Sequence, residues 1–420
     1  MKVERPKKPD IGSWTEQYPH LGTADVDYTD SVCPEFYERE RDAIFRKAWI
    51  HVGRVEELPR VGSYFTKEYK VCDTSIIVAR GQDKKIRAFH NICSHRGNKL
   101  VWEEFPNDET RGTTRVFQCK YHSWQYNLDG TLKQATREEE FFNFDRCRYG
   151  LAEISCDVWE GFIFINLDPT PEQTLKEFLG EMGEGLIDYP FHEMTQAYCF
   201  RAHIKSNWKV FADSFAEAYH TPYMHGKMSP EMAEDMVMAD GIAFKMMGMH
   251  NTTSFRHVPS DIEQATPIEQ LTQCGLYGPW KKPDLGGNLT PPGQNLSNHP
   301  DWGIDSHQIF PNFAIIIWER GWYHTWQFWP LNVDEHIFEC RQYFVPPKNA
   351  SERLAQEMAT ITTREYAAQD ANTLEATHSM LKARIKTHLP LCDQELALRN
   401  LHYHVNEWVN GRRPGAVAAE

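Results

Sequence analysis

Two short segments of the chain each place a histidine close behind a cysteine. They read CSHRG at residues 93–97 and CKYHSW at residues 119–124. The four potential donors are Cys93, His95, Cys119 and His122. Two thiolates and two imidazoles can hold an iron–sulfur cluster in which the cysteines bind one iron and the histidines the other. A four-coordinate zinc site or unrelated thiols are the alternatives. Zinc motifs usually group cysteine with cysteine and histidine with histidine, so this pairing favours the cluster.

The residues around these segments have the texture of a small all-β domain. Short β-rich runs at residues 75–79, 115–119 and 161–167 alternate with Gly, Asn and Asp turns between about residues 50 and 165. An Asp-Gly pair within residues 126–132 predicts a hairpin turn. We therefore expect both Cys-His segments to be loops that extend from a β-scaffold.

A second group of metal-binding residue types lies in the segment 213–226. Residues 206–220 favour a helix with Ser206 as its N-cap, and Asp213, Glu217 and His220 would share one face of it because they are spaced i, i+4, i+7. Pro222 cannot continue that helix. A break after His220 would let the chain turn back and direct the second histidine, His225, to the same point.

Two histidines and one carboxylate on one face of an iron leave coordination positions open for dioxygen. The alternative is a structural helix end with solvated histidines. The pattern predicts a mononuclear iron site at His220 and His225 when it is taken together with the upstream Cys-His pairs.

Taken together, these motifs resemble those of the Rieske non-haem iron oxygenases. The Cys-x-His … Cys-x₂-His pairs, with Arg96-Gly97 after the first half and Trp124 after the second, resemble the Rieske [2Fe–2S] motif. The later pattern, Asn207-Trp208-Lys209 followed by Glu-x-Tyr-His-x₄-His, resembles their catalytic domain, so the resemblance covers nearly the whole chain. The interval between the Rieske halves is longer than expected, and the polar run at residues 103–112 explains it as a surface insertion.

The resemblance implies roles for three acidic residues. The third iron ligand would be Asp370, followed by Glu375 five residues later, with Glu365 as the competing carboxylate on the same helix. Glu217 would bridge the two metal centres, on a path from His122 of one chain through Glu217 to His220 of the next. Asp213 would either assist from the adjacent turn or be solvated. Many aromatic dioxygenases have Asp at the bridging position, whereas Glu occurs in branches that oxidise methylated amines.

The fold class implied is α+β. An all-β Rieske domain would precede a catalytic domain made of an antiparallel sheet with helices, of the helix-grip, START-like type. We expect an N-terminal helical segment at residues 1–46 that packs on the catalytic domain, the Rieske domain at 47–165 and the catalytic domain at 166–420. Further expected elements are helices at 34–49, 172–186 and 350–384 (the last capped by Ser351), strands at 197–204, 313–319 and 322–330 with a turn at Arg320-Gly321, and long loops around short elements at 226–308.

Composition excludes several function classes. A formal charge of −14 argues against a protein that mainly binds nucleic acid or anionic membrane. We find neither the apolar core of an export signal nor an apolar run of about 20 residues that would span a membrane. Ten cysteines without such a signal indicate a reducing, cytoplasmic setting in which they are thiols or metal ligands.

The implied activity is that of the terminal oxygenase in a multicomponent system, with O₂ as co-substrate. The chain has no convincing nicotinamide or flavin fingerprint, so NADH electrons would arrive through a separate reductase, with or without a ferredoxin. The family implies a homotrimer (α3) or an α3β3 assembly. Two proteins of other classes stay open: a Rieske electron carrier without oxygenase activity, and a zinc-stabilised structural or binding protein.

For the substrate, we expect a hydrophobic aromatic or polycyclic compound that is hydroxylated or dihydroxylated. Flexible thioethers suit an adaptable apolar pocket, and they are plentiful at Met224, Met228, Met232, Met236, Met238, Met246, Met247 and Met249. Core packing is the alternative for half of them. The tryptophans Trp318, Trp322, Trp326 and Trp329 suit a pocket wall, a sheet core or an aromatic cage for a quaternary amine. The competing function is therefore a monooxygenase of methylated or quaternary amines, by N-demethylation or C–N cleavage, or an O-demethylase.

Overall fold

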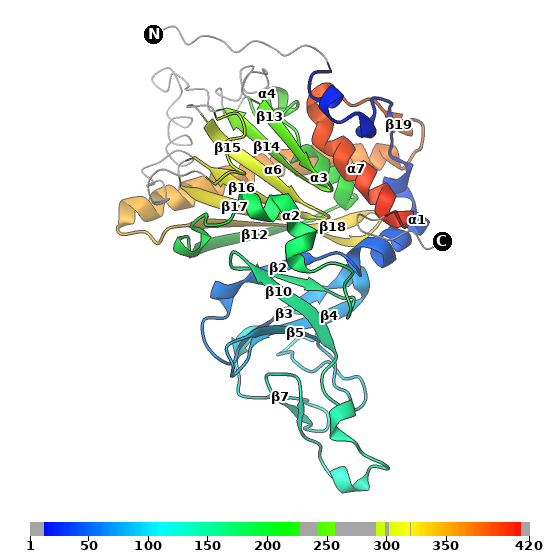
Figure 1. Cartoon of the computed structure of the whole chain (residues 1–420), viewed down its shortest axis with the longest axis vertical. Coiled ribbons are helices and arrows are strands. Elements are labelled where there is room, and N and C mark those ends of the chain that lie inside the picture. Colours follow the sequence, from blue (N-terminus) through cyan, green and yellow to red (C-terminus); the bar gives the residue numbers. More distant parts are fainter. Residues whose placement is uncertain (1–11, 227–241, 257–290, 299–301, 320, 413–420) are drawn as a thin grey trace. The chain divides into compact units, whose positions relative to one another are not determined.

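The computed structural model describes residues 12–226, 242–256, 291–298, 302–319 and 321–412. These residues form two compact units (Figure 1). One unit comprises residues 41–178, and the other combines the segment before residue 41 with residues from 179 onward. The N-terminal segment therefore belongs to the same unit as the C-terminal half of the chain.

The unit formed by residues 41–178 consists of two antiparallel sheets. In spatial order, the larger sheet contains β2 (Ile50–Arg54), β11 (Phe162–Asn166), β10 (Glu153–Trp159), β5 (Ile86–His90), β4 (Thr74–Arg80), β3 (Ser63–Tyr69) and β6 (Arg111–Thr113). The smaller contains β7 (Phe117–Gln118), β8 (Gln125–Tyr126) and β9 (Leu132–Gln134). The Asp-Gly turn joins β8 to β9, where Gly130 takes a φ of 86° that a side chain would disfavour. The small sheet packs its apolar face through Phe117, Tyr126 and Leu132.

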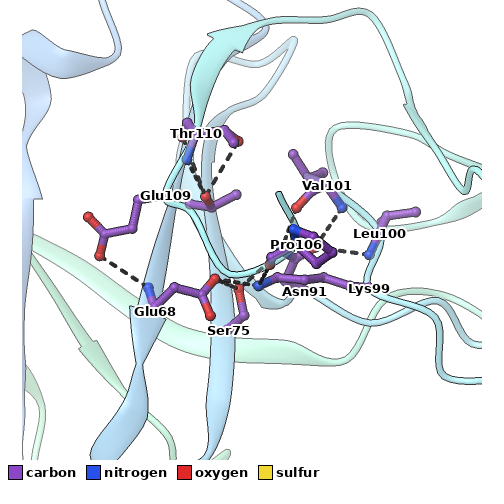
Figure 2. Close-up of polar contacts among 10 residues, drawn as sticks. Glu68, Ser75, Asn91, Lys99, Leu100, Val101, Pro106, Glu109 and Thr110 are labelled. Carbon is purple, nitrogen blue, oxygen red and sulfur yellow. Dashed lines mark hydrogen bonds and ion pairs between the residues drawn. The ribbon is translucent and has the colours of Figure 1, made fainter. Parts of the chain in front are cut away.

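The polar insertion at residues 103–112 is held by contacts at Pro106 and at Thr110 (Figure 2). On one side, the Lys99 ammonium pairs with Glu68 at 2.6 Å and donates to the carbonyl of Pro106. On the other, Thr110 donates its backbone N–H to the Thr66 hydroxyl at 2.7 Å. Residues 103–108, which include Pro106, are exposed. The extra length is thus accommodated on the surface, as the sequence predicts.

The second unit is built on another antiparallel sheet of seven strands. In spatial order these are β12 (Gln196–Ile204), β18 (Glu335–Phe344), β17 (Trp322–Asn332), β16 (Phe313–Trp318), β15 (Trp302–Ile309), β14 (His250–Arg256) and β13 (Ile242–Met247). A separate pair joins β1 (Val26–Asp27) to β19 (His388–Leu389). Even-numbered residues of β16 and β17 share one face, and Ala314, Ile316, Trp318 and Trp322 form an apolar cluster there with Ala359 of a helix.

Helices accompany this sheet. They are α1 (Pro34–Glu40), α2 (Leu175–Gly185), α3 (Trp208–Ser214), α4 (Thr221–Met224), α6 (Ala350–Leu381) and α7 (Leu396–Val409). The orange helix α6 crosses the sheet in Figure 1. Helix α6 contacts α3. Phe211 of α3 packs on Phe328 and Phe338 of the sheet. No helix in the described ranges is long and apolar enough to cross a membrane. The expected α+β architecture, an all-β domain followed by an antiparallel sheet with helices, is confirmed.

The helix expected at residues 206–220 is shorter than predicted. Helix α3 ends at Ser214, because the next amides tighten onto nearer carbonyls: Phe215 N–H bonds to Ala212 and Ala216 N–H to Asp213. Its N-cap is Asn207, whose side chain accepts from the Lys209 N–H at 3.0 Å, and not Ser206. Pro222 therefore opens the short helix α4 rather than directly ending α3.

Other expected elements need similar corrections. Asn349, not Ser351, caps α6 by accepting from the Glu352 N–H at 2.9 Å. The helix expected at 34–49 begins at Pro34 but changes into a π-helical turn at Arg41–Phe45. The helix expected at 172–186 is kinked at Gly180, whose φ is 46°. Arg320 of the expected hairpin turn lies outside the described residues.

The region 226–308, which we expected to be mainly loops, supplies three sheet strands: β13, β14 and β15. Strand β14 lacks apolar alternation because its fully buried side chains are polar, and two of them are paired with β15. Thr252 bonds to His307 at 2.9 Å, and the Ser254 hydroxyl donates to Asp305. Buried polar residues can pair with residues of a neighbouring strand. A strand that contains them lacks the apolar pattern of a strand and resembles a loop in the sequence.

A buried ion pair ties the N-terminal segment to α3. Lys209 pairs with Glu40 at the end of α1, and both side chains are fully buried. Trp208 lies beside them and donates its indole N–H to Glu40 at 3.4 Å. The Asn-Trp-Lys motif is therefore structural: Asn207 starts the helix, Trp208 fills the core and Lys209 neutralises Glu40.

Replacing one member of this pair should destabilise the protein strongly. We expect Lys209→Met to lower the free energy of unfolding by about 3–5 kcal/mol, because it leaves a buried carboxylate unpaired. Adding Glu40→Gln should recover most of that loss. As a control, Glu357→Gln breaks an exposed pair with Arg353 and should leave the free energy of unfolding nearly unchanged. Denaturant unfolding of the four proteins measures this, and equal losses for Lys209→Met and the control would contradict it.

Candidate active site

Three residues from two distant segments converge in the second unit. His220 precedes α4, His225 follows it, and Asp370 lies in the middle of α6. The Nε2 atoms of His220 and His225 are 3.5 and 3.3 Å from Asp370 Oδ1. One ligand atom from each of the three residues lies within 4.8 Å of the others. The short helix that contains Pro222 thus brings two imidazoles that are five positions apart in the sequence to one point.

Neighbouring side chains fix the orientation of both imidazoles. The Glu217 carboxylate accepts from Nδ1 of His220 and also from the His220 backbone N–H at 3.1 Å. Gln369 places its amide oxygen 2.8 Å from Nδ1 of His225. Since both partners are acceptors, Nδ1 carries the proton in each ring and Nε2 keeps its lone pair.

The resulting arrangement fits a metal ion. When both rings are neutral, two imidazole lone pairs face one carboxylate oxygen. Asp370 Oδ1 is buried and accepts no hydrogen bond from any residue within the described ranges. Burial lowers the pKa of His220, but Glu217 and Asp370 outweigh it and the pKa is raised, so this site favours positive charge. Two histidines and one carboxylate are the ligand set typical of mononuclear iron in oxygenases.

The other acidic residues considered from the sequence lie elsewhere. Buried Asp213 accepts from the Tyr28 hydroxyl at 2.9 Å and from Nε2 of His402 at 3.1 Å. It is therefore not part of the three-residue group. Glu365 is exposed and pairs with Arg364, while Glu375 accepts from a backbone N–H. Gln369 was not found from the sequence, and only its position next to Asp370 marks it.

In the other unit, two loops bring the Cys-His pairs together. The first follows β5 and the second joins β7 to β8. Cys93 and Cys119 are buried, and the rings of His95 and His122 are 4.6 Å apart between centroids. Backbone bonds close each loop, including Gly97 N–H to the Cys93 carbonyl at 3.0 Å and Ser123 N–H to the Cys119 carbonyl at 3.0 Å.

The surroundings of these four residues fit a Rieske cluster. The His95 ring stacks on Trp124 at 4.9 Å, and its Nδ1 is buried without a hydrogen-bond partner in the described structure, as a metal ligand requires. The Tyr126 hydroxyl lies 3.2 Å from the Cys93 sulfur and accepts from Ser94 N–H. Such hydrogen bonds tune the potential of a cluster. The sequence gives no signal for Tyr126.

A cavity of about 160 Å³ adjoins the three-residue group. Strands β15–β17 form its wall, α6 lies across it, and the segment between α3 and α4 completes it. Its aromatic lining consists of Phe215, Phe255, Trp318, Trp326 and Tyr366 together with two histidines of the site and His324. Glu217 and Asp370 are its acidic residues, and no Lys or Arg is present in the described lining.

Strand alternation separates Trp329 from the other three tryptophans. Trp318 and Trp326 line the cavity, Trp322 stacks on Trp318 and Phe344 on the same face but does not line it, and Trp329 is buried away from the cavity. The expected methionine-rich pocket is not found among the described residues: Met224, Met246, Met247 and Met249 do not line this cavity. Met228, Met232, Met236 and Met238 lie outside the described residues.

Two family profiles match the chain in the order of these two sites. The Rieske [2Fe–2S] domain matches residues 48–145, and the ring hydroxylating alpha subunit (catalytic domain) matches residues 191–411. The fold and the two donor sets therefore define a Rieske non-haem iron oxygenase, whose cofactors are a Rieske [2Fe–2S] cluster and a mononuclear iron. More specifically, the chain belongs to the ring-hydroxylating alpha subunit family, the catalytic subunits of these oxygenases.

Curated relatives include oxygenases of quaternary amines. The carnitine monooxygenase oxygenase subunit of Escherichia coli (strain K12) is 31% identical over 289 residues, which cover 69% of this chain and 72% of the relative. The chloroplastic choline monooxygenase of Amaranthus tricolor is 33% identical over 220 residues, covering 51% and 47%.

Solved structures share the fold at lower identity. A quaternary ammonium Rieske monooxygenase in complex with L-carnitine matches 97% of this chain and 99% of its own, with a TM-score of 0.71 and 19% identity. Naphthalene 1,2-dioxygenase from Rhodococcus sp. bound to indole matches 92% and 94%, with a TM-score of 0.69 and 19% identity. At this identity the likeness concerns the fold alone.

Removing the carboxylate of the three-residue group should selectively empty one metal site. We expect Asp370→Ala to lower the iron content from about three to about two per chain, since a [2Fe–2S] cluster holds two irons and the mononuclear site one. The Rieske absorption bands should persist. Glu365→Ala, on the same helix, should retain about three. Iron analysis with visible spectra measures both, and a full iron content in Asp370→Ala would contradict the assignment.

Proposed function

We propose that this chain is the terminal oxygenase of an NADH-driven system that oxidises a quaternary or methylated amine. The aromatic wall beside the three-residue group carries the proposal, since indole and phenyl faces attract quaternary ammonium groups. The absence of Lys and Arg from the described lining supports it, because nothing there repels a cation. The kinship to carnitine and choline monooxygenases supports the same substrate class.

In this proposal His220, His225 and Asp370 hold the mononuclear iron, and Cys93, His95, Cys119 and His122 hold the cluster. When bound, the cluster supplies electrons and the iron activates dioxygen next to the substrate. The chain's own residues hold the ligands in place: Glu217 and Gln369 keep the Nδ1 protons, and the aromatic wall keeps the substrate beside the iron.

Assembly is part of the proposal. Family members work with reductase partners and form oligomers, and we propose a homotrimer in which Glu217 of one chain links His122 of a neighbour to its own His220. The Glu217 carboxylate accepts a hydrogen bond from His220. A carboxylate can accept more than one hydrogen bond, so Glu217 could also orient the imidazole of His122 from a neighbouring chain. Asp213 supports this segment indirectly through Tyr28 and His402.

An aromatic substrate, the main expectation from the sequence, is not confirmed and stays the second candidate. The relative 2-aminobenzenesulfonate 2,3-dioxygenase subunit alpha from Alcaligenes sp is 34% identical over 195 residues, and the same wall would accept a planar ring. Glu217 separates the two candidates, because aromatic dioxygenases commonly carry the shorter Asp at that position.

Oxygen consumption with defined substrates tests the proposal. With NADH and a generic reductase, we expect choline, L-carnitine or γ-butyrobetaine to stimulate O₂ uptake and to release formaldehyde or trimethylamine. Naphthalene and 2-aminobenzenesulfonate should leave uptake at the background rate. Stimulation by the arenes alone, with a dihydroxylated product, would reject the amine and establish the second candidate.

The bridging role of Glu217 has its own test. We expect Glu217→Gln to keep about three irons per chain but to lose most NADH-coupled turnover, by roughly 10²-fold or more, because the neutral amide no longer fixes both rings. Glu193→Gln, which changes an exposed carboxylate, should retain wild-type turnover. Iron analysis and NADH oxidation on the same samples decide, and a fully active Glu217→Gln would refute the bridge.

A further inference from the structure

The cavity wall contains a histidine that the iron site does not use. His324 lies near the start of β17, and only 1% of its surface is exposed. Its ring sits among indoles, with centroids 4.9 Å from Trp326 and 5.6 Å from Trp322. It also lines the cavity beside the three-residue group. A polar ring in an apolar wall needs a reason, because burying an unpaired polar group costs free energy.

The hydrogen bond from Trp318 defines the protonation of this ring. The indole Nε1–H of Trp318 is 3.1 Å from His324 Nδ1. An indole N–H can only donate, so Nδ1 must offer its lone pair. Burial lowers the pKa of His324 to about 3, which keeps the ring neutral near pH 7. A neutral imidazole carries one proton, and in this ring that proton must be on Nε2.

The Nε2–H group is left without a partner. It is buried and makes no hydrogen bond to any described residue. A buried donor without a partner has lost its hydrogen bond to water and gained none in return, which destabilises the empty site. His324 lines the cavity, so a small movement of the ring or of its neighbours would let a ligand there accept from this donor.

We propose that His324 is a specificity-determining residue whose Nε2–H donates a hydrogen bond to an oxygen atom of the substrate. A quaternary nitrogen has no lone pair and no hydrogen, so it cannot be the partner. The substrate must therefore carry a hydroxyl, carbonyl or carboxylate oxygen in addition to its ammonium group. This inference rests on the proposed function for the amine end of the substrate, and on His324 alone for the oxygen end.

Matched ligands isolate this hydrogen bond. Choline and propyltrimethylammonium differ only in a hydroxyl that replaces a methyl group, and benzyl alcohol and ethylbenzene differ in the same way without an ammonium. Calorimetric titration of the iron-loaded oxygenase, without reductase, gives dissociation constants in the absence of turnover. We expect the wild type to bind the hydroxyl member of a pair about tenfold more tightly, as a net hydrogen bond of about 1.4 kcal/mol implies.

Variants then assign the preference to the residue. His324→Phe should bring the ratio within each pair close to one, while His324→Gln, which keeps an N–H donor, should restore part of it. Thr325→Val is the matched control, because residue 325 points to the opposite face of β17 and should leave the ratio unchanged. Iron content reports whether each variant is folded.

The outcomes distinguish the two proposals. Equal affinities within both pairs for the wild type, or an undiminished preference in His324→Phe, would overturn the role of His324. Discrimination between benzyl alcohol and ethylbenzene without binding of either ammonium compound would sustain His324 and reject the amine function. Tight but equal binding of the two ammonium compounds would support the amine function and reject the role of His324.

Discussion

Three lone pairs that face one another are the constraint on which the second unit depends. Two imidazole Nε2 atoms and one carboxylate oxygen lie within 4.8 Å of one another. Such a group is repulsive unless a cation occupies it. The tautomers that create it are set from outside the group, by Glu217 and Gln369. The break after α3 and the course of α6 across the sheet therefore build the same site. The break positions the two histidines, and α6 positions Asp370.

Local spacing explains which parts could be predicted. The cluster donors lie on two short loops, so their roles follow from residue type and distance along the chain. The same holds for His220 and His225, because Pro222 lies between them. Asp370 was predicted only through a family resemblance, since many acidic residues lie on a helix of that length and only the packing of α6 selects one. Asp213 shows the converse: helical spacing placed it on the site face, but α3 ends at Ser214 and its carboxylate turns to Tyr28 and His402.

The strands of residues 242–309 were missed for a related reason. A strand is recognised by alternating apolar residues, whereas β14 buries Thr252 and Ser254 and satisfies them through His307 and Asp305 of β15. Those partners lie more than fifty positions away, and sequence patterns within a window cannot show them. The same limit applies to the substrate pocket. Which tryptophans line it depends on the register of β16 with β17, and this register pairs Trp318 with Trp322.

The charged residues of the cavity lie at the iron site, whereas the rest of its described lining is neutral. This arrangement determines how the cavity can select a substrate. Of its carboxylates, Glu217 accepts from His220 and Asp370 faces both imidazoles of the three-residue group, and both are largely neutralised once a divalent ion binds between the ligands. The rest of the described lining is mainly apolar, aromatic or neutral, and His324 cannot acquire charge near pH 7. Selection must then come from ring faces, which favour a diffuse cation or a planar ring, and from single directed hydrogen bonds. A neutral donor discriminates through the bond that it offers: a ligand with an acceptor pairs the buried Nε2–H of His324, whereas a ligand without one leaves it unpaired.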